Sequence, residues 1–120
     1  MKQPRENDNA YLDFIRQLPC CICGDSTTTE AAHIRFADRR AAKRPTGMGE
    51  KPSDVWALPL CGRHHREQHT MNERKFWIGK GLDPIFIALA LNRVRGNIDD
   101  ASQIVGCSIP APLMAGERNR

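Results

Sequence analysis

Apolar side chains recur at helical spacing near the start of the chain. Positions i, i+3, i+4 and i+7 of one helical face are occupied by Tyr11, Phe14, Ile15 and Leu18. Asp8 or Asn9 is suited to cap the first turn, and Pro19 cannot continue the helix. The pattern predicts a short amphipathic helix over residues 9–18.

Two short apolar runs follow, and each predicts a β-strand. The first covers residues 30–36 (EAAHIRF) and the second covers residues 55–60 (VWALPL). Pro59 has no backbone N–H, so it places the second strand at an edge or an end. Between the runs, residues 37–54 are rich in Arg, Lys, Gly and Pro and offer little to bury. This segment is predicted to be a long basic loop, and such loops in small domains are commonly functional.

Helical patterns dominate the second half of the chain. Residues 61–70 (CGRHHREQHT) predict a histidine-rich helix, and a further helical segment contains Glu73, Phe76 and Trp77. Asp83-Pro84 has the N-cap and N1 pattern of another helix, which stops near Gly96 and whose apolar positions include Ile85, Leu89 and Val94. One more short helix is expected around residues 100–105.

These elements predict an α+β protein with a single domain. We expect the domain to cover residues 1–96, with residues 97–120 as a partly disordered C-terminal extension. The chain has 120 residues, of which 40% are hydrophobic and only 6% aromatic, so its core is thin. Small domains of this kind often gain stability from a metal or from disulfides.

The five cysteines indicate metal binding more than disulfides. Their odd number suits a secreted scaffold poorly, and the polar N-terminus has no signal-peptide pattern. No apolar run approaches the roughly 18 residues of a membrane span. We therefore expect a soluble, cytoplasmic protein in which clustered Cys and His residues bind metal.

Two ligand pairs at metal-binding spacing carry the strongest signal. Cys20-x-x-Cys23 and Cys61-x-x-His64 are separated by 37 residues and together offer the four ligands of a structural Zn²⁺ site. Cys21 is an alternative to Cys20 in a slightly different turn. Cys107 stands far from both pairs and is expected to be a lone thiol.

The other histidines form a second candidate site. His65 and His69 stand at i and i+4, on the same face of the predicted helix, whereas His64 points about 100° away. His65 and His69 are therefore candidates for a second metal, although a polar helix face is the alternative. His33 lies beside the basic segment, and a neutral imidazole is suited to act as a general base.

The net charge of +4 is concentrated in one segment. Between residues 35 and 51 there are two acidic residues and six basic ones, namely Arg35, Arg39, Arg40, Lys43, Arg44 and Lys51. A localised positive segment is typical of a protein that binds a polyanion such as DNA. A solvated charged loop is the alternative interpretation.

With these residues in place, the sequence resembles the HNH, or ββα-metal, nucleases. In particular it is similar to the phage recombination enhancement function (Ref) group and its uncharacterised prophage relatives. The resemblance rests on PCCICG at residues 19–24, AAHI at residues 31–34, and the stretch from residue 47 to residue 77. It implies a strand pair and a helix around a catalytic divalent cation, with a zinc knuckle beside them.

The resemblance also implies roles for single residues. His33 would activate a water molecule, and His65 and His69 would hold the cation, which would be Mg²⁺, Mn²⁺, Ni²⁺ or Zn²⁺. Many members of the family carry a metal-binding acidic residue or histidine just before the general base, where this chain has Ala32. A carboxylate from elsewhere, such as Asp54 or Glu67, is then a candidate. Asp54 also occupies the approximate place of the family's middle asparagine.

The sequence therefore predicts a metal-dependent endonuclease that hydrolyses DNA with little sequence specificity of its own. The Ref resemblance implies a phage or prophage origin and a link to recombination, with a recombinase filament as a partner. One alternative is a non-catalytic zinc module that binds nucleic acid. Another is an interaction adaptor that docks through the helix at residues 85–94, although that helix is more simply interpreted as core.

Overall fold

The computed structural model describes residues 8–46 and 52–109 of the chain. It confirms the predicted α+β class. Along the chain the elements are α1 (Asn9–Arg16), β1 (Thr29–His33), η1 (Arg39–Ala41), η2 (Asp54–Trp56), β2 (Ala57–Cys61), α2 (Gly62–His69), α3 (Glu73–Lys80), α4 (Pro84–Arg93) and α5 (Ile98–Ser108).

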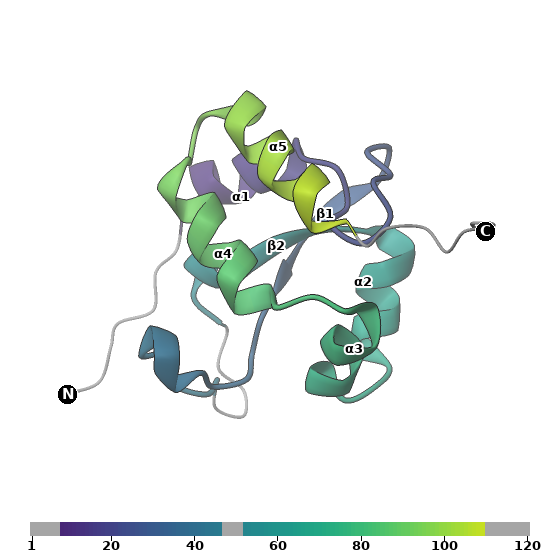
Figure 1. The fold of residues 1–120 in the computed structure, drawn as a ribbon, viewed down its shortest axis with the longest axis vertical. Helices are drawn as coiled ribbons and strands as arrows, with labels where there is room; N and C mark the ends of the chain where they lie inside the picture. The colour runs from purple at the N-terminus through teal and green to yellow at the C-terminus, as the bar shows by residue number, and fades with distance from the viewer. Residues whose placement is uncertain (1–7, 47–51, 110–120) are drawn as a thin grey trace.

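The two strands pair antiparallel, in a register that runs from Thr29 opposite Cys61 to His33 opposite Ala57. Both strands are shifted from their predicted bounds. β1 ends at His33, and β2 begins only at Ala57 because residues 54–56 form the 3₁₀ helix η2. α2 begins directly after β2, so β1, β2 and α2 follow one another in a ββα order. This connection fixes the direction of α2 relative to β1 (Figure 1).

Helices cover the strand pair from two sides. α1 packs on both strands, α4 packs on β2, and α5 packs on α4. α2 also contacts both strands, and α3 packs on α2. Figure 1 shows α1, α4 and α5 gathered on one side of the strands, and α2 and α3 on the other.

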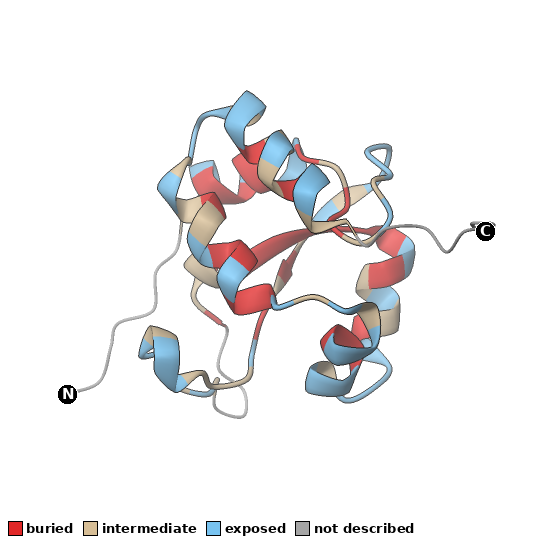
Figure 2. Cartoon of the chain, viewed as in Figure 1, coloured by how far each residue is buried: buried red, intermediate tan, exposed pale blue. Residues whose placement is uncertain are grey.

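One hydrophobic cluster joins these elements, and Figure 2 shows its buried positions on the strands and on the inner faces of the helices. The predicted face of α1 is confirmed, since all four of its apolar residues are buried. α5 is longer than the short helix expected there, and its Ala101 and Val105 belong to the same cluster. Residues 110–120 of the expected extension lie outside the described residues.

Leu89, one of the apolar residues of α4, lies outside the buried stripe of the helix and is 44% exposed. Pro84, Ile87, Ala88 and Leu91 are buried and stand at i, i+3, i+4 and i+7. Leu89 follows Ala88 by one position and therefore points about 100° away from Ala88, outside this stripe. Half of the ten residues of α4 are buried, and all of these except Pro84 belong to the core cluster, as expected.

The basic segment is more ordered than a plain loop. η1 begins after Asp38, and an isolated β-bridge pairs Asp38 with Lys43. Ala42 has a φ of 53°, the left-handed conformation that lets the chain reverse at the end of η1. Across the described residues, no helix is both long and apolar enough to cross a membrane.

Asp83 joins α4 to the basic segment. Its side chain accepts hydrogen bonds from the backbone N–H groups of Ile85 and Phe86, as the predicted N-cap should, and from the guanidinium of Arg40. Burial raises the pKa of Asp83, but the bonds from Arg40 and the two N–H groups outweigh it and hold the pKa below its usual value.

We predict that Asp83→Ala lowers the free energy of unfolding by about 1–2 kcal/mol, the usual cost of losing a helix cap. Because the folded pKa is depressed, this stabilisation is present above the ordinary aspartate pKa of about 3.9 and is lost as the pH falls through the folded value. Urea unfolding at pH 7 and pH 3 measures both effects. Asp99→Ala, in the first turn of α5, is the control, and an equal loss at Asp83 and Asp99 would contradict the cap.

Candidate functional site

The four residues of the two predicted ligand pairs converge. The ligand atoms of Cys20, Cys23, Cys61 and His64 all lie within 4.8 Å of one another, in a group that can hold a metal ion. The first two come from the turn after α1, the third ends β2, and His64 lies in the first turn of α2. Segments 37 residues apart in sequence therefore build a single centre.

The distances fit one tetrahedral ion. Ligand atoms around a zinc ion with Zn–S near 2.3 Å and Zn–N near 2.1 Å lie about 3.5–3.8 Å apart. The Sγ atoms of Cys23 and Cys61 are 3.9 Å apart, and Nδ1 of His64 lies 3.7 Å from Sγ of Cys20 and 3.3 Å from Sγ of Cys61. Three thiol ligands and one imidazole are also a donor set that zinc prefers, so these residues fit Zn²⁺.

The turn that presents the first pair is closed by backbone hydrogen bonds. Gly24 N–H donates to the carbonyl of Cys20 at 2.8 Å, and Gly24 has a φ of +81°, which favours glycine. A Cβ at Gly24 would also lie 3.3 Å from Cδ1 of Ile109. The N–H of Ile22 donates to Sγ of Cys20 at 3.4 Å. The turn is therefore shaped to aim the sulfur of Cys20 at the centre.

The structure also distinguishes Cys20 from Cys21. Burial raises the pKa of Cys20, but the N–H groups of Cys61, Cys23 and Ile22 outweigh it, and the net shift is downward. Cys21 lies outside the ligand group, and burial raises the pKa of its thiol strongly. Cys20 is therefore the residue placed to act as a thiolate ligand, and Cys21 is a buried apolar residue.

The pKa of His64 is lowered, mainly by burial and then by the nearby charges of Arg63 and Lys80. A neutral imidazole is the form that binds metal. Cys23 is the more exposed thiol of the group, and burial together with the neighbouring Cys20 raises its pKa to about 11. Cys107 is exposed on α5, apart from this centre.

His33 ends β1 and is held by a buried carboxylate. Its Nε2 lies 2.9 Å from Oδ1 of Asp54, which is only 1% exposed. Oδ2 of Asp54 accepts the backbone N–H of Asp8 at 2.6 Å. With Nε2 engaged by a carboxylate, Nε2 carries the proton and Nδ1 is left with the lone pair. The His33 side chain is 18% exposed, so part of it is open to solvent.

His65 and His69 form a separate pair on α2. Their Nε2 atoms lie 3.2 Å apart, and the rings are 4.9 Å apart between centroids. Nδ1 of His65 lies 2.6 Å from Oε1 of Glu30 at the start of β1. The i, i+4 spacing thus brings two imidazole nitrogens together, as expected. The Glu30 carboxylate contacts the other nitrogen of the His65 ring.

The three histidines do not form one ligand cluster. Side chains alternate along a strand, so Glu30 and Ala32 leave β1 on one face and His33 on the other. The ring of His33 contacts Asp54, while the ring of His65 contacts Glu30 and His69. In the described part of the chain, the group of three or more candidate ligands that lies close enough for one ion is the Cys3His group.

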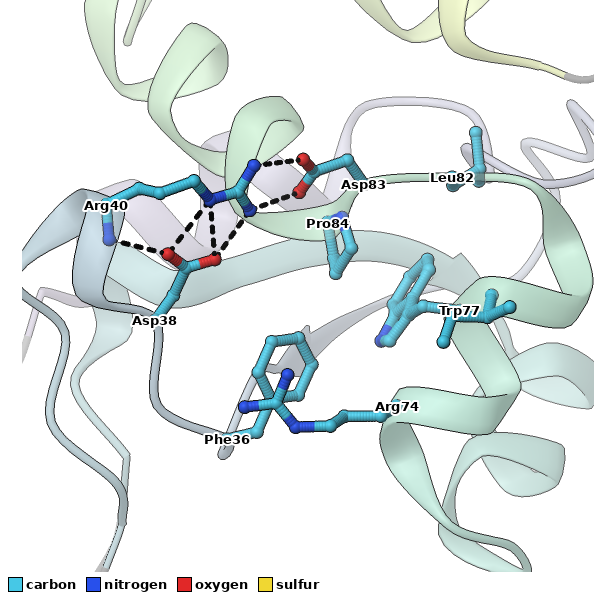
Figure 3. Close-up of a pocket in the computed structure, with 9 residues that line it drawn as sticks. Phe36, Asp38, Arg40, Arg74, Trp77, Leu82, Asp83 and Pro84 are labelled. Carbon is cyan, nitrogen blue, oxygen red and sulfur yellow. Dashed lines mark hydrogen bonds and ion pairs between the residues drawn. The ribbon is translucent and has the colours of Figure 1, made fainter.

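The basic side chains have different environments. Arg40 is bound by Asp38 and Asp83, beside a surface hollow of about 200 Å³ in which Arg74 stacks on Phe36 (Figure 3). Lys43 is only 5% exposed, and burial lowers its pKa.

Arg35 and Arg39 are exposed, and Arg44 is half-buried. Lys51 lies outside the described residues. Within the described residues, therefore, the side chain of Arg39 is exposed, whereas the guanidinium of Arg40 is bound by two carboxylates and Lys43 is buried.

The sequence analysis missed Glu30, and it named Asp54 as a candidate carboxylate for the cation and as the counterpart of the family's middle asparagine. The signal for Glu30 was the direct connection of β2 to α2. Because no loop separates them, the first turns of α2 must pass the start of β1, where Glu30 is the exposed residue. Nothing in the sequence indicated that Asp8 contacts Asp54; it was expected only as a helix cap.

Comparison with known proteins places the chain in a family. Residues 1–93 match the model of DUF968, described as a protein family of unknown function. The chain belongs to this family. It is also 32% identical over 73 residues to the uncharacterized protein YdfU of Escherichia coli K12, across 58% of this chain and 19% of YdfU. The chain thus spans about a fifth of the length of that relative. No solved structure matches it.

We predict that Cys61→Ser removes zinc and unfolds the chain, because the free energy of zinc binding is also folding free energy, on the order of 10 kcal/mol for small zinc domains. Elemental analysis and far-UV circular dichroism of the purified variants measure the two effects. Cys21→Ser is the matched control and should retain stoichiometric zinc. A folded Cys61→Ser protein without zinc would show that the centre is not structural.

Proposed function

We propose that this protein is a metal-dependent endonuclease of the ββα-metal type, braced by a structural zinc in the Cys3His group. The observation that carries the proposal is the hydrogen bond between His33 and the buried Asp54 at the end of β1. A histidine whose ring is oriented by a buried carboxylate is the usual arrangement of a general base. The ββα order of the surrounding elements supports the same assignment.

In this proposal Nδ1 of His33 accepts the proton of a water molecule that attacks a phosphodiester. Asp54 holds Nε2–H and stabilises the imidazolium that forms, in the role that an aspartate has behind other catalytic histidines. Asp54 is itself fixed by the N–H of Asp8. The proton therefore moves to Nδ1 of His33. The hydrogen bond from Nε2–H to Asp54 fixes the orientation of that ring.

His65 and His69 are the proposed ligands of the catalytic cation. Two nitrogens about 2.1 Å from one ion, at angles of 90–110°, lie about 3.0–3.4 Å apart. The 3.2 Å between their Nε2 atoms fits this range. A divalent cation, when bound there, would supply charge stabilisation to the phosphate and to the leaving oxygen.

The proposed substrate is the backbone of DNA. Arg35 follows His33 by two positions and Arg39 by six, and both are exposed. Arginines that meet phosphates position a nucleic acid without reading its sequence. The resemblance to the Ref group extends the proposal to recombination, with a recombinase filament guiding where the enzyme cuts.

A cleavage assay tests the proposal on supercoiled plasmid and on single-stranded DNA, with zinc-loaded protein and added Mg²⁺, Mn²⁺ or Ni²⁺. We predict that cutting requires the added cation and that His33→Ala slows it by about 10²–10⁴-fold, the usual contribution of a general base. The variant should keep its zinc and its circular dichroism spectrum, because His33 lies outside the zinc centre.

Two results would count against the assignment. Undiminished cutting by His33→Ala would mean that another group is the base. DNA retention without cutting under all three cations would favour the non-catalytic zinc module that binds nucleic acid.

We also predict that Arg39→Ala weakens DNA binding uniformly across sequences and lowers the slope of log affinity against log salt by about 1. Arg40→Ala is the matched control, since Asp38 and Asp83 already bind its guanidinium. Fluorescence anisotropy over a salt series measures the slope. An equal change in the two variants would contradict the assignment of Arg39.

A further inference from the structure

Glu30 has a contact that the roles given so far leave unexplained. Its side chain is 51% exposed, yet Oε1 lies 2.6 Å from Nδ1 of His65. Ala32, two positions later on the same face of β1, offers no ligand to the cation site. We propose that Glu30 is the carboxylate of that site and acts as a positioning residue through His65. This inference rests on the proposed cation-binding role of His65 and His69.

The other carboxylates nearby are engaged elsewhere. Asp54 lies against His33 and the N–H of Asp8. Glu67 pairs with Lys80 at 3.2 Å. Glu73 accepts hydrogen bonds from the N–H of Arg35 and from the side chain of Gln68. Among the described residues, Glu30 is the carboxylate that contacts the pair.

The contact decides which nitrogen of His65 can bind metal. When the Glu30 carboxylate accepts Nδ1–H, the lone pair of the neutral ring stays on Nε2. That nitrogen faces Nε2 of His69. A carboxylate behind a metal-binding histidine also makes the imidazole a stronger ligand and fixes its orientation, and removing such a partner typically costs 10–100-fold in metal affinity.

The fold brings Glu30 to His65 by a direct route. β1 and β2 pair with Thr29 opposite Cys61, so Glu30 lies next to the point where α2 begins. Gly62 leaves space for the carboxylate, because a Cβ there would lie 3.2 Å from Oε2 of Glu30. The contact thus follows from the strand register and from a glycine at the first position of the helix.

The test is calorimetric titration of the zinc-loaded full chain with Ni²⁺, followed by a zinc assay to verify that the Cys3His site is still filled. Glu30→Ala should bind Ni²⁺ about 10–100-fold more weakly than the parent. Glu30→Gln can still accept Nδ1–H but lacks the charge, so its affinity for Ni²⁺ should lie between those of the parent and Glu30→Ala. Glu67→Gln removes the same charge two residues from each histidine and should bind Ni²⁺ like the parent.

Each other outcome has a definite meaning. If His65→Ala loses Ni²⁺ binding while both Glu30 variants bind like the parent, the positioning role is overturned and the cation site stands. A loss in Glu67→Gln as large as in Glu30→Gln would also overturn it, since general charge would then explain the effect. If His65→Ala binds Ni²⁺ like the parent, the cation site itself is wrong. Should Glu30→Ala fail to fold, Glu30→Gln alone decides.

Discussion

The meeting of two ligand pairs at the Cys3His centre is the constraint on which the rest of the structure depends. It ties the turn after α1 to the junction between β2 and α2, in a chain whose apolar core is thin. Since His64 faces this centre from the first turn of α2, the rotation of that helix about its axis is set there. His65, on another face of the same helix, is consequently directed toward Glu30 of β1, and His69 contacts His65.

The side chains of Glu30 and His33 leave β1 on opposite faces, because side chains alternate along a strand. Glu30 meets α2 on one face, and His33 meets Asp54 on the other. A buried carboxylate is costly unless hydrogen bonds satisfy it. Asp54 has such bonds to His33 and to the N–H of Asp8, so its burial is consistent with a fixed histidine.

The features that could be predicted from sequence are those set by near neighbours. The buried face of α1, the two ligand pairs and the Asp83-Pro84 start of α4 each depend on spacings of a few residues. The features that could not be predicted depend on strand register and on packing between distant segments. Arg40 contacts Asp83 from 43 positions away, and Glu30 meets His65 from 35 positions away. Leu89 is exposed because the buried stripe of α4 runs through other apolar positions of the helix.

Asp8 connects the His33 site to parts of the chain outside the strand pair and α2. Its N–H binds Asp54, its Oδ1 caps α1, and its Oδ2 contacts Arg95, which follows α4. The carboxylate behind His33 is thus supported by segments on either side of the ββα unit in sequence. The unit is therefore not a transferable module: a hairpin and helix grafted onto another scaffold would carry the histidine but leave behind the backbone group that holds its partner.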